Sequence, residues 1–175
     1  MSSQIDGKQA MNNMKQLLII TGLLLNGMMS DAQNSIPEET LFNLSGNQIS
    51  SVEALNHDGP VLLVFWTITC HNMIDGLIDI NDDYYDDWKE EFGLKIVALS
   101  VDDERNRSKI GPFVNGKDWD FDVYTDPNRD FMRVMNVNIH PHLFLINKEK
   151  KVVWQKTSYL EGDENILYEE LKKLN

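Results

Sequence analysis

Cys70 is the residue best suited to covalent chemistry in this sequence, and it is the only cysteine of the chain. It closely follows six consecutive apolar residues, 61–66, which predict a buried strand. After it, apolar residues recur at helical spacing as far as Phe92 and predict an amphipathic helix. Cys70 is therefore expected where a strand ends and a helix begins. Unpaired N–H groups and the positive end of the helix dipole at such a position stabilise the thiolate, the nucleophilic form of cysteine.

The stretch from Phe65-Trp66 to Cys70 resembles the active-site region of the thioredoxin superfamily, most closely the exported TlpA/ResA-type thiol–disulfide oxidoreductases. Those proteins have a buried strand, Phe-Trp, a short turn, and Trp-Cys-x-x-Cys at the start of a helix. A second match is Ile139-His140-Pro141, which precedes the apolar residues 143–146. At this place the family has a cis-proline, and the residue before it offers its backbone to a bound peptide.

The active-site motif departs from the family pattern at several positions. Met73 stands where the family has its second cysteine, and Gly76 stands at the position of a glutamate that aids proton transfer. In a two-cysteine protein the second thiol releases the mixed disulfide that the first one forms. Met73 cannot do this, so an adduct on Cys70 would wait for an external thiol.

The resemblance implies which residues form the site. Cys70 would be the nucleophile and His71, in the first helical turn, would stabilise its thiolate. His140 would flank the thiol and could exchange a proton with a leaving sulfur. The expected substrate-binding residues are Trp66, Met73, His140 and Pro141. His142 is expected to point to the opposite face of its strand, so neither a metal site nor a cofactor is predicted.

Two other functions remain open from the residues alone. The rewritten motif is also compatible with a thioredoxin-like module that has lost catalysis and binds a peptide or a partner protein. Thr67-x-x-Cys70 matches the Thr-x-x-Cys of one-cysteine peroxiredoxin-type peroxidases. This chain lacks the proline that those enzymes have before the threonine, and it lacks an arginine before Leu143-Phe144. The peroxidase function therefore ranks below thiol–disulfide exchange.

The charge and the N-terminus indicate where the protein works. A formal charge of −12 argues against binding to nucleic acid or to anionic membranes. The resemblance implies that the partners are protein or small-molecule thiols and disulfides. Lys15 precedes an apolar run, 17–29, and Ser30-Asp31-Ala32 follows it. This pattern predicts a signal peptide over residues 1–32 and a periplasmic or secreted protein, associated with a membrane only if the segment stays uncleaved.

The remaining pattern predicts one domain. Residues 33–40 are expected to be an extended lead-in, and residues 41–175 a thioredoxin-like domain. The α/β fold would have a central mixed sheet flanked by helices and an N-terminal β-hairpin extension. The helix after Cys70 is expected to run to about Glu91 and to end at Gly93. Asp102, Asp103 and Glu104 are expected to form a solvated loop and the start of a helix.

Overall fold

The computed structural model describes residues 36–174. The signal peptide predicted over residues 1–32 lies outside the described residues, as do the first residues of the lead-in. Residues 36–39 have no regular structure and lead into the first strand. No helix among residues 36–174 combines the length and the apolar character needed to cross a bilayer.

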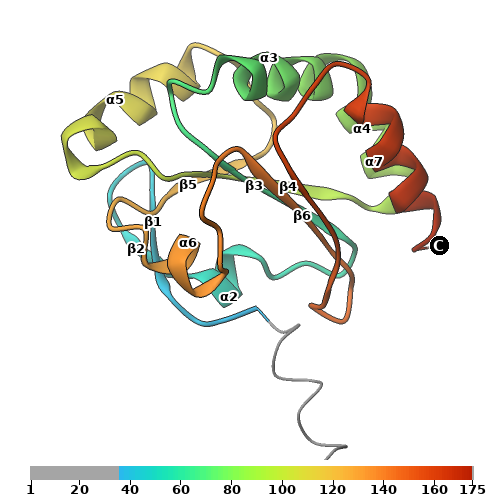
Figure 1. The fold of residues 1–175 in the computed structure, drawn as a ribbon, viewed down its shortest axis with the longest axis horizontal. Helices are drawn as coiled ribbons and strands as arrows, with labels where there is room; N and C mark the ends of the chain where they lie inside the picture. The colour runs from blue at the N-terminus through green and yellow to red at the C-terminus, as the bar shows by residue number, and fades with distance from the viewer. Residues whose placement is uncertain (1–35, 175) are drawn as a thin grey trace, which may run out of the picture. The chain divides into compact units, whose positions relative to one another are not determined.

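A mixed sheet forms the centre of the domain (Figure 1). Its order is β2-β1-β5-β4-β3-β6-β7, with β3, β4 and β5 parallel to one another and the other pairs antiparallel. The strands are β1 (Thr40–Asn43), β2 (Gln48–Ser50), β3 (Val61–Trp66), β4 (Lys95–Ser100), β5 (Asp122–Thr125), β6 (His142–Ile146) and β7 (Val152–Thr157). Every residue of β3 is buried, as its unbroken apolar run predicts for a central strand.

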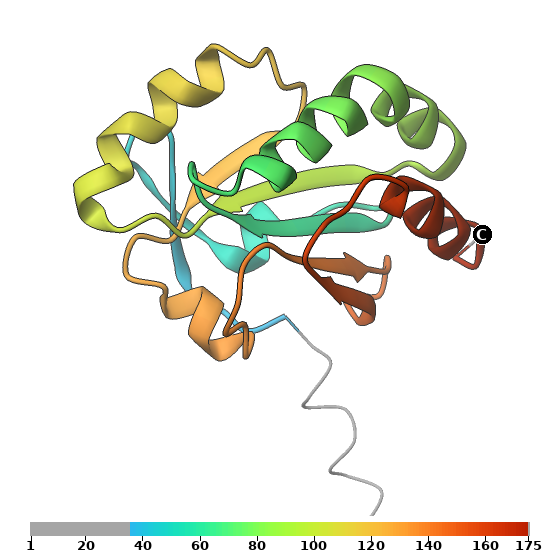
Figure 2. The same ribbon diagram turned by 45° about the horizontal axis from the view of Figure 1, so that its top comes forward.

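Helices cover both faces of the sheet, as Figures 1 and 2 show. One face carries α3 (His71–Asp79), the π-helix η1 (Ile80–Tyr84), α4 (Tyr85–Phe92), α5 (Glu104–Asn115) and α7 (Asp163–Lys172). The other face carries the short helices α2 (Ser51–Ala54) and α6 (Asp130–Val134). Alternate residues of β3 enter the two cores, with Leu62, Val64 and Trp66 on the first face. The predicted fold class, with its N-terminal hairpin, is confirmed.

The helix after Cys70 has one feature that the sequence pattern did not predict. It is interrupted by the π-turn of η1 before it ends at Gly93, which adopts the predicted left-handed conformation with φ 65°. The cause is the spacing of its buried residues, because Ile80 and Tyr85 are both buried but lie five positions apart. One extra residue in the turn keeps both side chains on the sheet, whereas a regular α-helix would rotate one of them away.

Gly76 lets the first turns of α3 pack closely against the chain that follows β7. A Cβ atom on Gly76 would lie 2.2 Å from the ring of Tyr159, which is itself buried. The Tyr159 hydroxyl donates a hydrogen bond to Glu164 at 3.3 Å. The ring is therefore held both by this bond and by its packing against α3. No side chain larger than hydrogen fits at position 76 without moving this ring.

We expect Gly76→Ala to lower the free energy of unfolding, measured by urea denaturation. The steric overlap with Tyr159 should cost about 1–3 kcal/mol. This outweighs the roughly 1 kcal/mol that alanine contributes within a helix. Gly116→Ala is the matched control, because the nearest heavy atom to its Cβ is a carbonyl oxygen at 3.6 Å. Equal stability of the two variants would contradict the proposed packing constraint.

Candidate active site

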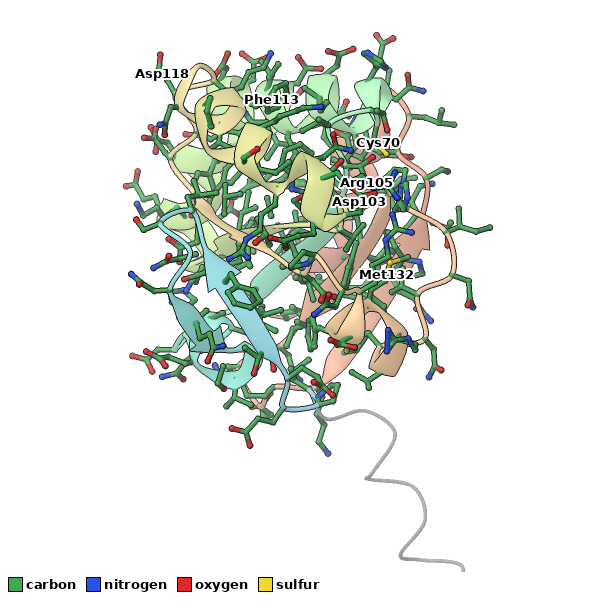
Figure 3. The ribbon with its side chains drawn as sticks, turned by 90° about the vertical axis from the view of Figure 1, so that its left-hand side faces the viewer. Cys70, Asp103, Arg105, Phe113, Asp118 and Met132 are labelled. Carbon is green, nitrogen blue, oxygen red and sulfur yellow. The ribbon has the colours of Figure 1, made fainter. Side chains whose placement is uncertain are left out.

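Cys70 lies where β3 has ended and α3 begins, as predicted. It is the N-cap residue of α3, and its carbonyl accepts hydrogen bonds from the N–H groups of Met73 and Ile74 at 3.0 and 2.9 Å. Its own N–H donates to Thr67 O at 2.9 Å, which closes a tight turn after the strand. The side chain is partly exposed. Figure 3 shows it on the same face of the molecule as Asp103 and Arg105, at the start of α5.

Two side chains contact the sulfur of Cys70. His140 Nδ1 and Thr67 Oγ1 each lie 3.2 Å from Sγ. Thr67 is buried and its hydroxyl is also 3.0 Å from that of Thr69. His140 reaches the sulfur from a loop 70 residues later in the chain, and its peptide bond to Pro141 is cis. The sulfur therefore has a titratable base on one side and a hydroxyl on the other.

The electrostatic environment keeps His140 neutral. Burial lowers the pKa of its imidazole from the ordinary value of 6.5 and the positive charge of Arg129 lowers it further, while the negative charge of Asp102 opposes both. A neutral imidazole at physiological pH can accept the proton of a thiol. The geometry and the charge state thus both suit His140 to act as a general base for Cys70.

Asp102 is a structural part of the site, and the prediction of a solvated loop is wrong for this residue. Asp102 is 5% exposed, and its Oδ2 accepts hydrogen bonds from Ile68 N–H and from the Ser100 hydroxyl, both at 2.9 Å. It thereby fixes the turn that carries Cys70. Its contact with the turn of Cys70 could have been predicted from its position just after β4, because the carboxyl ends of adjacent parallel strands meet at one edge of a sheet. Asp103 does cap α5, through a bond to Asn106 N–H.

Three predicted site residues need correction. The side chain of His71 is exposed and makes no hydrogen bond or ion pair within residues 36–174, and the histidine that contacts the sulfur is His140. Trp66 and Met73 are fully buried in the core that α3 covers, and neither presents surface to a substrate. Both are adjacent to the site in sequence, but their apolar side chains are used for packing.

The loop of the cis-proline offers an open edge next to the sulfur. His140 and Pro141 are both partly exposed, and the Pro141 carbonyl accepts a hydrogen bond from Ser158 N–H at 2.9 Å. The backbone N–H and C=O of His140 have no partner among residues 36–174. The preceding Ile139 is 65% exposed. An extended chain could therefore pair with the backbone here and cover an apolar side chain.

His142 points away from the sulfur, as predicted. Its ring nitrogens lie 3.2 Å from Gln155 Oε1 and 3.2 Å from Thr157 Oγ1, on the neighbouring strand. Within the described part of the chain, no three His, Cys, Asp or Glu side chains are grouped as metal ligands.

The sheet, the helices on both faces and the cysteine at the start of α3 define a thioredoxin-like protein. A thioredoxin-like protein from Porphyromonas gingivalis has a solved structure that is 31% identical, with a TM-score of 0.70 over 79% of this chain and 90% of that one. A thioredoxin-like protein from Haemophilus influenzae is 25% identical over 138 residues, covering 76% of this chain and 78% of the relative. A putative thiol:disulfide interchange protein DsbE from Chlorobium tepidum is 20% identical with a TM-score of 0.68, over 81% of this chain and 95% of that one, and shares the fold.

Residues 32–155 match the model of the AhpC/TSA family. The matched segment contains strands β1 to β6 and part of β7, Cys70 with its turn, and the loop of His140. The chain therefore belongs to the AhpC/TSA family of thioredoxin-like proteins.

We expect Asp102→Ala to cost about 1–3 kcal/mol in the free energy of unfolding, because it leaves the partly buried Ile68 N–H and the buried Ser100 hydroxyl without this acceptor. Asp102→Asn retains an oxygen that can accept both hydrogen bonds, and it should cost clearly less. Urea denaturation of both variants measures this difference. If the two variants lose equal stability, the charge of Asp102 matters to the fold rather than its hydrogen bond to the turn.

Proposed function

We propose that this protein carries out single-cysteine thiol–disulfide exchange at Cys70. The observation that carries the proposal is the partly exposed sulfur of Cys70 lying 3.2 Å from the Nδ1 atom of His140. A module that only binds a partner needs neither an accessible thiol nor a base beside it. Membership of a thioredoxin-like family supports the same class of chemistry, and within it we place the chain near the TlpA/ResA-type proteins.

The chemical step uses these two side chains. His140 takes the proton of the Cys70 thiol, and the thiolate attacks one sulfur of a substrate disulfide along the S–S axis. A bond forms between Sγ and that sulfur while the substrate's S–S bond breaks. The leaving thiolate takes the electron pair and then receives the proton from the His140 imidazolium. The Thr67 hydroxyl, 3.2 Å from Sγ, stabilises the attacking thiolate by a hydrogen bond.

Release of the mixed disulfide requires a thiol from another molecule or from the substrate itself. Cys70 is the only cysteine of the chain, and Met73 has no thiol to offer. A second substrate thiolate attacks the mixed disulfide, forms a new disulfide and frees Cys70. The overall reaction exchanges or isomerises disulfides and needs no other oxidant or reductant.

The compartment follows from the N-terminal pattern. We propose that residues 1–32 direct export and that the domain works in the periplasm or outside the cell, with Pro141 and the His140 backbone at the substrate-binding edge. Disulfides persist in such compartments, so substrates for exchange are available there.

The Thr67 contact gives a second candidate function. A threonine hydroxyl beside the sulfur could also orient a peroxide, in which case Cys70 would attack one oxygen to form a sulfenic acid and release an alcohol or water. Thiol–disulfide exchange remains the preferred reaction, because the cis-proline loop provides an edge for a peptide. Mass spectrometry separates the two: a peroxidase forms the sulfenic acid with hydrogen peroxide faster than it forms a mixed disulfide.

The proposal predicts how Cys70 reacts with 2-hydroxyethyl disulfide, followed by mass spectrometry of the full chain. The wild-type protein should form one mixed disulfide, and Cys70→Ser should form none. His140→Gln should slow the reaction at about pH 7 by roughly tenfold or more, because it removes the base beside the sulfur. His142→Gln is the matched control, since His142 does not contact the sulfur, and it should react at the wild-type rate. A folded wild-type protein that does not react would refute the function.

The pH dependence of the same reaction tests the charge state of His140. Its pKa is lowered from 6.5, so its neutral form persists throughout the range above that value. The part of the rate that depends on His140 should therefore stay high above 6.5 and fall only as the pH drops through the lowered pKa. In His140→Gln this acidic step should be absent, and a step that remains in the variant would assign the titration to another group.

A further inference from the structure

Arg129 is an exposed cation beside the active site that has no carboxylate partner. Its Nε donates a hydrogen bond to Val101 O at 2.9 Å. Val101 directly precedes Asp102, whose carboxylate holds the turn of Cys70. Within residues 36–174, Arg129 makes no ion pair, and its terminal nitrogens have no acceptor. One nitrogen of the guanidinium is thus hydrogen-bonded to the protein, and the outer two nitrogens are available to a ligand.

The acidic residues around Arg129 are already engaged. Asp126 accepts hydrogen bonds from the N–H groups of Asp130 and Met132 at 2.9 Å each. The Asp130 carboxylate pairs with Arg133 at 2.9 Å. The positive charge of Arg129 is available to a ligand.

The local backbone gives no reason for an arginine at this position. Arg129 has φ 59° and ψ 32°, the left-handed conformation, and it is the N-cap residue of α6 without making a side-chain cap. Asparagine or glycine suits this conformation better, and asparagine also caps helices well. What an arginine adds at this position is its guanidinium group.

The charge of Arg129 acts on the reactive centre. It is one of the causes that lower the pKa of His140, whose imidazole contacts the sulfur of Cys70. Val101, which accepts the bond from Arg129, also donates its N–H to Trp66 O at 2.8 Å, at the end of the strand that leads to Cys70. A substrate group bound at Arg129 would therefore lie near the sulfur under attack. A guanidinium binds a carboxylate with two parallel hydrogen bonds, which orients it as well as attracting it.

We propose that Arg129 binds a carboxylate of the substrate, so that the protein selects thiols and disulfides whose sulfur lies a few bonds from a carboxylate. This inference rests on the proposed exchange at Cys70 and names the substrate class of that site. The exchange step itself is unchanged. Arg129 holds the substrate while the Cys70 thiolate replaces its leaving sulfur.

The test compares the rates at which full-length protein forms mixed disulfides with two matched small disulfides. 3,3′-Dithiodipropionate carries carboxylates, and 2-hydroxyethyl disulfide is neutral. In Arg129→Asn the ratio of the anionic to the neutral rate should fall about three- to tenfold relative to wild type, the size expected for one partly exposed charge pair. Arg129→Lys should recover part of this ratio. Added salt should lower the ratio in the wild type and much less in Arg129→Asn.

Lys109→Gln is the control, because Lys109 is an exposed cation that pairs with no carboxylate within residues 36–174, and its loss changes the net charge equally. Its ratio should equal that of the wild type. An equal fall in Lys109→Gln and Arg129→Asn would show that only net charge matters and would overturn the proposal. A fall confined to Arg105→Gln would also overturn it, since Arg105 is an exposed cation on the same face as Cys70 (Figure 3).

The carboxylate belongs either to a small thiol or to a peptide. A pair of disulfide-bonded peptides with Glu or Gln next to the cysteine provides the second arm of the test. If the preference for the anionic probe depends on Arg129 with the small disulfides or with the peptides, the proposal is supported and the source of the carboxylate is identified. If it depends on Arg129 with neither kind of probe, the proposal is overturned. If wild-type protein reacts with none of the probes, the proposed function fails. If it reacts with all of them regardless of residue 129, only this inference fails.

Discussion

The hydrogen bond from Ile68 N–H to the buried carboxylate of Asp102 is the interaction on which the site depends. It joins the segment after β3 to the segment after β4, at the edge where these parallel strands end. A turn of two or three residues between a strand and a helix has many conformations available, and each would place the sulfur differently. The carboxylate selects one of them. The position of Cys70 is therefore set by a residue more than thirty places away in the sequence.

The groups around the sulfur come from separate parts of the chain, and the sheet brings them together. Thr67 and Cys70 follow β3, Asp102 follows β4, Arg129 begins α6, and His140 precedes β6. β3 lies between β4 and β6, so the ends of all three strands are neighbours. Asp102 and Arg129 act on the pKa of the His140 imidazole with opposite signs. The chemistry of the thiol is thus a property of the sheet edge rather than of the short cysteine motif.

Local patterns in the sequence were sufficient for most of the fold. The apolar run of β3, the turn glycine at 93 and the position of Cys70 depend on near neighbours, and each was predictable. The contact between Cys70 and His140 was expected from the resemblance alone. Asp102 was missed because a buried acid looks the same in sequence as its exposed neighbours, and its burial depends on the distant Ile68. Trp66 and Met73 were misassigned because proximity in sequence to a cysteine does not distinguish a contact surface from a core.

The close packing of Gly76 against Tyr159 limits how the site could change. The resemblance places a glutamate of the two-cysteine proteins at this position, and here the ring of Tyr159 occupies the space that its side chain would need. Introducing that glutamate would require a second change at residue 159, and introducing a resolving thiol would require a third change at the buried Met73. Each of these changes alone disturbs a packed core. Selection acting one substitution at a time therefore meets a barrier, and the core of this domain favours keeping a single thiol.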